Sequence, residues 1–232
     1  MSAFSEDKYV MLISSLPSPN GLFKSSHTPL SRIKLEQRLS VLSPAEHTIL
    51  ASVEKALDWR FLDADMSDEM IRALDLHAIS SVRNETLSLI IRNRLEMRTL
   101  IAATRMRHNG KAKPSSARWG FGRWQTHIIN HWQEADFALS HLFPWINEFR
   151  QHIENDNPVL AERLILTESF KQLQRLSHQH RFDFEAVVIY VLKWNILDRS
   201  LNSNGYQAQR RFEQLVKQGL GQYRQLFTQE AR

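Results

Sequence analysis

Residues 84–110 read NETLSLIIRNRLEMRTLIAATRMRHNG, and this stretch decides the fold class. Apolar residues recur with the spacing of a helix from Asn84 to His108, which is longer than most helices of globular proteins. The following Asn109 and Gly110 are typical of a helix end, because both residues tolerate a left-handed backbone. The stretch therefore predicts a single long helix.

The rest of the chain shows further signals for helices. Ser43-Pro44-Ala45-Glu46 is a capping box that predicts a helix to about Leu57. Helix starts are also predicted at Thr28-Pro29, Ser67-Asp68-Glu69, Gln125, Asn157-Pro158, Asp183 and Gln207, with a break before Pro144 and an end at 202–205. Tyr9–Leu16 fits either a short strand or a short buried helix. The sequence predicts an all-α fold, an elongated bundle of about seven to nine helices, with that one N-terminal strand as an alternative.

Composition narrows the class of protein. The chain has 232 residues, of which 42% are hydrophobic, and it contains no cysteine, which excludes disulfides and thiolate metal sites. No apolar run approaches the roughly 20 residues of a membrane span. The N-terminus lacks the basic start of a secretory signal, so we expect a cytoplasmic protein.

Residues 110–124 predict a linker between two helical halves, residues 1–109 and 125–232. We expect the two halves to form one continuous structural unit.

The positive charge is concentrated in one segment. Residues 81–124 carry two acids, Glu85 and Glu96, and the following ten basic residues: Arg83, Arg92, Arg94, Arg98, Arg105, Arg107, Lys111, Lys113, Arg118 and Arg123. This segment therefore has a net charge of 10 − 2 = +8, whereas the whole chain has +5. Such an imbalance predicts one basic surface. The candidate partner-binding residues are Arg92, Arg107, Lys111, Lys113, Arg118, Trp119, Arg123 and Trp124.

The linker contains a distinctive motif, Arg118-Trp119-Gly120-Phe121-Gly122-Arg123-Trp124. Three interpretations are open. The aromatic rings could stack on bases while the arginines neutralise phosphates. The same residue types could dock into a partner protein, where Trp and Arg dominate binding. The linker could also fold back so that its rings fill the seam of the bundle.

Three arginines of the long helix fall on its apolar face. Arg94, Arg98 and Arg105 lie in the same arc as Leu87 and Ile91 when residues are placed 100° apart. A buried charge without a partner is costly. We predict that Asp198, on the apolar side of its own helix, pairs with one of these arginines. Alternatively, their stems cover apolar surface while their charged ends reach water.

The sequence contains no pattern of a catalytic or phosphate-binding motif. His127 and His131 are four residues apart and could share a metal ion, with a third ligand from His141, His178 or His180. The HIINH sequence lacks the Glu of a zincin, and we expect surface or interface histidines instead. We predict no catalytic residue, no metal and no cofactor.

Several stretches resemble a bacterial protein family. They are YVMLISSLP (9–17), PLSRIKLEQRLSVLSPAEHTIL (29–50), NPVLAERLILTESFKQLQRLSHQHRFDFEAVVIYVLKWNILDRS (157–200) and RRFEQLVKQGLG (210–221). The family is domain of unknown function 2764, whose members are typically encoded beside subunits of V/A-type rotary ATPases. Residues 85–105 and 182–199, with the pattern E-A-x-x-x-Y-x-L-K, also look like the C subunit (subunit d) of those ATPases.

The resemblance implies a non-catalytic helical adaptor. The C subunit is a stack of helical bundles that sits on the membrane rotor ring and receives the central shaft. The expected partners are therefore rotor and stalk subunits of a rotary ATPase, with peripheral contact at the cytoplasmic membrane. The alternative from another class is a helical nucleic-acid-binding protein that uses the basic 81–124 segment. A metal-dependent helical enzyme built on His127 and His131 is a third interpretation.

Overall fold

The structure is a computed structural model, and it describes residues 3–18, 21–24, 27–58, 82–116 and 119–202. These residues form helices joined by turns, and no strand occurs among them. The predicted all-α fold is confirmed. In the described residues, no helix is both long enough and apolar enough to span a lipid bilayer.

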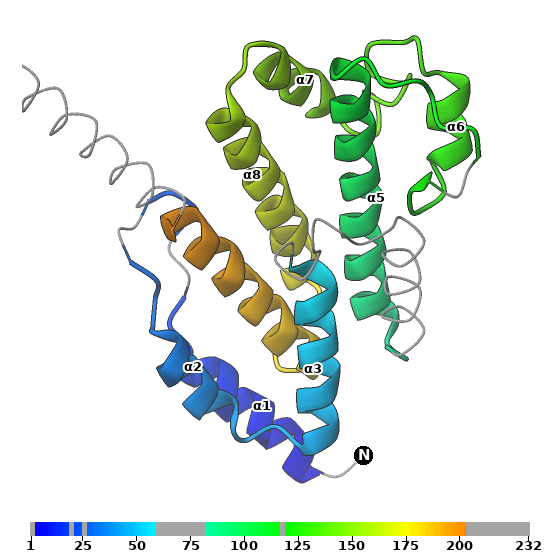
Figure 1. Cartoon of the computed structure of the whole chain (residues 1–232). Coiled ribbons are helices and arrows are strands. Elements are labelled where there is room, and N and C mark those ends of the chain that lie inside the picture. Colours follow the sequence, from blue (N-terminus) through cyan, green and yellow to red (C-terminus); the bar gives the residue numbers. More distant parts are fainter. Residues whose placement is uncertain (1–2, 19–20, 25–26, 59–81, 117–118, 203–232) are drawn as a thin grey trace, which may run out of the picture.

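The helices are distributed along the whole described chain (Figure 1). Their bounds are α1 Ala3–Ser15, α2 Arg32–Leu39, α3 Pro44–Leu57, α5 Glu85–His108, α6 Gln125–Asn130, α7 Ile146–Glu154 and α8 Pro158–Ser177. A further helix, orange and unlabelled in Figure 1, covers residues 184–202. We refer to it as helix 184–202.

Helix α5 matches the prediction at both ends. The side chain of Asn84 accepts a hydrogen bond from the Leu87 backbone N–H at 3.0 Å and so caps the first turn. At the other end Asn109 is the C-cap, and Gly110 has a φ of 69°, a left-handed conformation that suits glycine.

Three other predicted helix starts are also confirmed. Ser43 and Glu46 form the complete capping box of α3, in which each side chain bonds the backbone of the other. Asn157 caps α8 through the Leu160 N–H, and Asp183 accepts the Ala186 N–H at 2.8 Å at the start of helix 184–202. Each cap depends on residues only three positions apart, which is why sequence alone could identify it.

The structure decides one open alternative and corrects two local predictions. For Tyr9–Leu16 the helix is confirmed and the strand is excluded, because most of the run belongs to helix α1. Helix α2 is capped by Ser31 rather than Thr28, whose hydroxyl bonds the Leu30 carbonyl instead. The helix that begins at Gln125 ends already at Asn130, well before Pro144. Two predicted helices lie outside the described residues, those that start at Ser67 and Gln207. The predicted helix end at 202–205 also lies outside them, apart from Asn202.

The hydrophobic core consists of two clusters. The first cluster joins α1, α2, α3, the N-terminal half of α5 and helix 184–202, and it includes Leu166 and Leu173 of α8. The second joins the C-terminal half of α5 to α6, the turns between α6 and α7, α7 and the start of α8. Figure 1 shows α6 and α7 at one end of α5, with α1 and α2 toward the opposite end of the molecule. Each cluster draws on both 1–109 and 125–232, and α5 and α8 belong to both clusters.

Helix 184–202 is the most apolar helix, yet it contains a buried lysine. The Lys193 ammonium donates to Gln174 Oε1 at 2.8 Å and lies 3.0 Å from Ser177 Oγ. Burial lowers the pKa of Lys193 to about 8. Trp194 of the same helix donates its indole N–H to the Leu30 carbonyl at 2.9 Å, which fastens the helix to the segment before α2.

Candidate functional site

The basic residues of segment 81–124 do not form a single surface. Those with exposed side chains are Arg83, Arg92, Arg105, Lys111, Lys113 and Arg123, whereas Arg118 lies outside the described residues. Arg92 and Arg105 are 13 positions apart on α5, which places them about 140° apart around the helix axis. They therefore face different sides of the molecule.

Arg107 is used inside the fold. Its guanidinium donates to the carbonyl oxygens of Trp132, Glu134 and Ala135, and it lies 4.4 Å from the centre of the Phe137 ring. Burial, and secondarily the charge of Arg150, lowers the pKa of Arg107. Arg107 thus fastens the turns after α6 to the end of α5, and it is not a free partner-binding residue as predicted.

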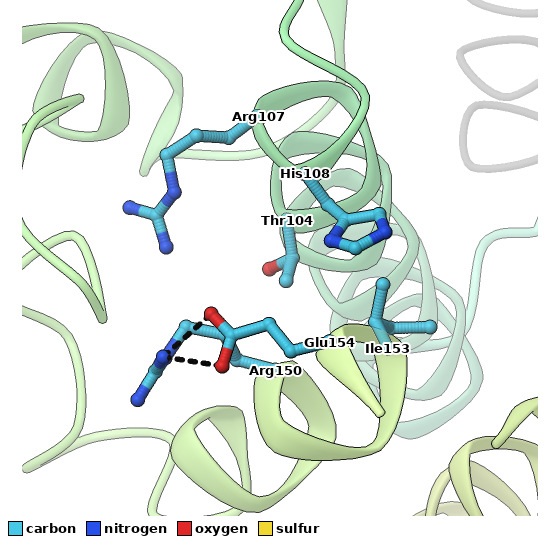
Figure 2. Close-up of a pocket in the computed structure, with 6 residues that line it drawn as sticks. All are labelled: Thr104, Arg107, His108, Arg150, Ile153 and Glu154. Atoms are coloured by element: carbon cyan, nitrogen blue, oxygen red, sulfur yellow. Dashed lines mark hydrogen bonds and ion pairs between the residues drawn. The ribbon is translucent and has the colours of Figure 1, made fainter. Parts of the chain in front are cut away.

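A polar cavity of about 330 Å³ lies between the last turns of α5 and α7 (Figure 2). Its lining residues are Thr104, Arg107, His108, Arg150, Ile153 and Glu154. Arg150 Nη1 donates to both carboxylate oxygens of Glu154 at 2.7 and 2.8 Å. The C-terminal end of a helix is the negative end of its dipole, and two such ends meet here. The arginines of the cavity therefore compensate helix ends and a carboxylate.

The Trp/Arg linker folds back onto the bundle. Trp119 and Trp124 are partly buried against the second cluster, and the Trp124 ring meets that of Phe143 edge-on at 6.4 Å. The Thr99 hydroxyl of α5 accepts the Phe121 N–H at 2.8 Å. Gly122 has a φ of 94°, and a Cβ there would lie 2.3 Å from Glu96 Cγ. The linker therefore lies directly against α5, as the third interpretation predicted.

One arginine of this motif still faces solvent. The side chain of Arg123 is 72% exposed, and its Nε lies 3.4 Å from Glu96 Oε1. Only the arginine of this pair faces solvent, since the Glu96 side chain is 10% exposed. Arg123 and Arg92 therefore remain available to a partner.

The inward-facing arginines of α5 differ from one another. Arg94 is only 7% exposed, and Arg98 Nη1 donates to the Ala56 carbonyl at the end of α3 at 3.0 Å. Arg105 is exposed, and its guanidinium lies 6.0 Å from the centre of the Phe149 ring. The helical pattern thus correctly predicted burial for Arg94 but not for Arg105.

The predicted pairing of Asp198 with one of these arginines is not found among the described residues. The Asp198 carboxylate accepts a hydrogen bond from Asn202 Nδ2, four residues later on the same helix, at 3.2 Å. The neighbouring Arg199 instead forms an ion pair with Glu162 of α8 at 2.8 Å. A helical wheel places a side chain around its own helix but does not say which neighbouring helix it meets.

His127 and His131 stack on each other. Their ring centres are 4.0 Å apart with an angle of 25° between the planes, and His131 Nδ1 lies 2.9 Å from the His127 carbonyl. In the part of the chain that the structure describes, neither belongs to a group of three candidate metal ligands. Both side chains are half-buried, and the expectation of surface or interface histidines stays a prediction.

Such a group exists elsewhere, and sequence reasoning missed it. Ligand atoms of His180, Asp183 and Glu185 lie within 4.8 Å of one another. His180 Nδ1 is 2.7 Å from Asp183 Oδ2, its Nε2 is 3.2 Å from Thr86 Oγ1, and Glu185 accepts from Asn84. The H-x-x-D-x-E spacing could have indicated the group. Its atoms already have hydrogen-bond partners that join the starts of α5 and helix 184–202.

The comparison with protein families gives a clear result. Residues 60–219 match the sequence profile described as protein of unknown function (DUF2764), which is more than half of the chain. The chain belongs to this family. The resemblance to DUF2764 inferred from the sequence is thereby confirmed. No curated protein and no solved structure matches the chain significantly.

Exposed cations on α5 and in the segment after it stand out among the described side chains. Most of the other polar groups described above have hydrogen-bond partners, whereas Trp119 Nε1, Trp124 Nε1 and His127 Nε2 are buried without one among the described residues. The candidate site of this DUF2764 protein is therefore a surface, made of Lys111 and Lys113 after α5 and of Arg92 with Arg123 beside Glu96.

Proposed function

We propose that this protein is a non-catalytic helical adaptor of a V/A-type rotary ATPase, which links the central shaft to the membrane rotor ring as the C subunit does. The observation that carries the proposal is α5, which packs into both hydrophobic clusters and so joins the two ends of the molecule. An adaptor between two partners needs such a continuous body. The resemblance of residues 85–105 and 182–199 to the C subunit supports the choice of partner.

The docking surface is smaller than the sequence suggested. Arg107, Trp119 and Trp124 are used within the fold. Lys111 and Lys113 are exposed in the segment that directly follows α5. Exposed lysines attract an acidic partner over a distance and accelerate binding, an effect that salt weakens. We therefore assign these two lysines to contact with an acidic rotor or stalk subunit, which would hold the protein at the cytoplasmic membrane without inserting it.

Nucleic-acid binding receives less support. Binding to single strands needs aromatic rings that are free to stack on bases. Trp119 and Trp124 pack against the second cluster, and the exposed basic side chains of α5 face different sides. We therefore retain nucleic acid only as an outcome of the test.

The test is a tagged pull-down from gently solubilised membranes of the source cell, with bound proteins identified by mass spectrometry. We expect rotor and stalk subunits of a rotary ATPase in a fixed ratio, and their loss as salt increases. The double variant Lys111→Glu, Lys113→Glu should lose them. The matched control is Lys24→Glu, Lys34→Glu, which makes the same change of charge at two other exposed lysines.

Two outcomes would contradict the proposal. Absence of every ATPase subunit from the wild-type fraction would refute the adaptor role, and nucleic acid in that fraction would support the alternative. Equal recovery with both double variants would refute the assigned docking surface.

A further inference from the structure

Three metal-ligating side chains converge where α8 passes into helix 184–202. His180 and Asp183 lie in the turn between the two helices, and Glu185 lies in the first turn of helix 184–202. One ligand atom of each residue lies within 4.8 Å of those of the other two, and all three residues are half-buried. An imidazole nitrogen and two carboxylate oxygens therefore meet at one point.

The spacing of these atoms is close to that of a metal site. Zinc binds imidazole nitrogen and carboxylate oxygen at about 2.0–2.2 Å, so two ligands of one tetrahedral ion are about 3.4 Å apart. His180 Nδ1 and Asp183 Oδ2 are 2.7 Å apart, because they share a hydrogen bond. A metal ion in place of the shared proton would move these two atoms apart by less than about 1 Å. Rotation of the side chains is sufficient for a change of this size.

Groups of another helix orient two of the three ligands. His180 Nε2 lies 3.2 Å from the Thr86 hydroxyl oxygen, and Glu185 Oε1 accepts a hydrogen bond from Asn84 Nδ2 at 2.5 Å. Metal-binding histidines usually donate their second ring N–H to an oxygen atom, and metal-binding carboxylates are usually hydrogen-bonded as well. The start of α5 thus supplies the outer partners that a metal site needs.

The protons and charges of the group are compatible with a divalent ion. A neutral imidazole carries one proton, which can leave Nδ1 for Nε2 and be donated there to the Thr86 oxygen. The Asp183 carboxylate uses Oδ1 to accept the Ala186 N–H, so Oδ2 can bind a metal while the helix cap persists. Two ionised carboxylates match the charge of one divalent cation.

We propose that His180, Asp183 and Glu185 bind one divalent transition-metal ion of the zinc class, through His180 Nδ1 and one oxygen of each carboxylate. The imidazole nitrogen favours zinc over Mg²⁺ and Ca²⁺, which prefer oxygen ligands. Three protein ligands leave a fourth position for water. The ion fixes the turn after α8 to the start of α5. This site is independent of the docking surface at Lys111 and Lys113.

The test uses zinc ions and the full chain, which is first freed of metal with a chelator. Equilibrium dialysis measures the stoichiometry and the affinity for Zn²⁺. Thermal unfolding in Zn²⁺, in Mg²⁺ and in chelator measures stabilisation, because a ligand of the folded state raises Tm. We expect one tightly bound Zn²⁺ per chain, a higher Tm in Zn²⁺ than in chelator, and no such rise in Mg²⁺ at the same concentration.

Three variants identify the residues responsible. Asp183→Asn is the decisive one, because asparagine caps a helix as well as aspartate does but lacks the charged ligand oxygen. It should fold, bind Zn²⁺ at least about tenfold more weakly and lose the rise in Tm. Thr86→Val removes only the hydroxyl that orients His180, and it should weaken binding about 10- to 100-fold. The matched control, His178→Gln, removes an exposed histidine of the same turn and should bind like the wild type.

The inference fails if the wild type binds no Zn²⁺ or if Zn²⁺ leaves its Tm unchanged. It also fails if Asp183→Asn binds Zn²⁺ as tightly as His178→Gln does, because the ion would then lie on other histidines. An equal rise of Tm in Mg²⁺ would indicate carboxylate ligands alone and would overturn the role of His180. None of these results affects the pull-down, so the two proposals can fail separately.

Discussion

The Glu46 carboxylate at the start of α3 allows a quantitative test of the fold. It accepts hydrogen bonds from Lys8 Nζ at 2.9 and 2.7 Å, from the Ser43 backbone N–H and hydroxyl, both at 2.7 Å, and from the Tyr9 hydroxyl. Its side chain is only 15% exposed. One carboxylate thus joins α1 to the first turn of α3.

The pKa of Glu46 gives the magnitude. Burial alone would raise this pKa, but the bonds from Lys8, Tyr9 and Ser43 outweigh burial and lower it from 4.5 to about 2. Each tenfold change in proton affinity corresponds to about 1.4 kcal/mol, so the ionised network contributes at most about 3.5 kcal/mol. Because the folded-state pKa is lower than the unfolded one, this contribution is present above pH 4.5 and disappears as pH falls toward 2.

Glu46→Gln should therefore lower the free energy of unfolding by about 2 kcal/mol at neutral pH, since glutamine keeps some hydrogen bonds but loses the charge. The difference from wild type should shrink by more than half at about pH 3. Urea unfolding followed by circular dichroism at both pH values measures it. The control is Glu36→Gln, whose carboxylate is 60% exposed and pairs with Arg32 on the surface. It should cost less than about 0.5 kcal/mol at either pH.

A loss in Glu46→Gln that is the same at both pH values would refute the reasoning, because the effect would then not depend on ionisation. A loss no greater than that of Glu36→Gln would show that α1 does not depend on this carboxylate.

Three further substitutions test other parts of the fold. Arg107→Met should lower the free energy of unfolding by about 2 kcal/mol, because three carbonyl groups lose their hydrogen-bond donor. The control, Arg92→Met, should lower it by less than about 0.5 kcal/mol. Equal changes in Tm for the two variants would contradict this prediction. Gly122→Ala should lower the free energy of unfolding by about 1–3 kcal/mol, because the backbone φ is 94° and the new Cβ would meet the Glu96 side chain. An unchanged Tm would show that residue 122 does not approach Glu96 so closely. Wild-type stability should rise as pH increases from about 8 to 10.5, as the penalty on buried, protonated Lys193 is relieved. Lys193→Met should remove that rise, as measured by urea unfolding at several pH values. If the variant still becomes more stable with increasing pH, groups other than Lys193 cause the rise.

Local signals predicted much of the fold. The caps at Ser43, Asn84 and Asp183 depend on a side chain and a backbone group three positions apart, so the sequence contains all the information needed. The eight residues of Tyr9–Leu16 were ambiguous, because so short an apolar run fits either a strand or a helix.

The candidate site could be predicted only in part. Arg107 and Trp132 are 25 positions apart, and only the turns after α6 bring the carbonyl groups to the guanidinium. The positions of Trp119 and Trp124 likewise follow from how the linker meets α5. Charge counting identified the basic segment, but only the tertiary structure separates Lys111 and Lys113 from the basic residues used inside the fold.

The sharing of α5 between the two clusters has a consequence for how the molecule opens. Met97 and Leu100 belong to the second cluster, while Leu87 and Leu95 belong to the first, on one uninterrupted helix. Neither cluster can lose its packing completely without exposing part of α5, so partial unfolding of one end draws on the stability of the other. The backbone amides of α5 should exchange with deuterium only through concerted global unfolding. Slow fluctuations in the described part of the chain would then be confined to its turns and outer helices.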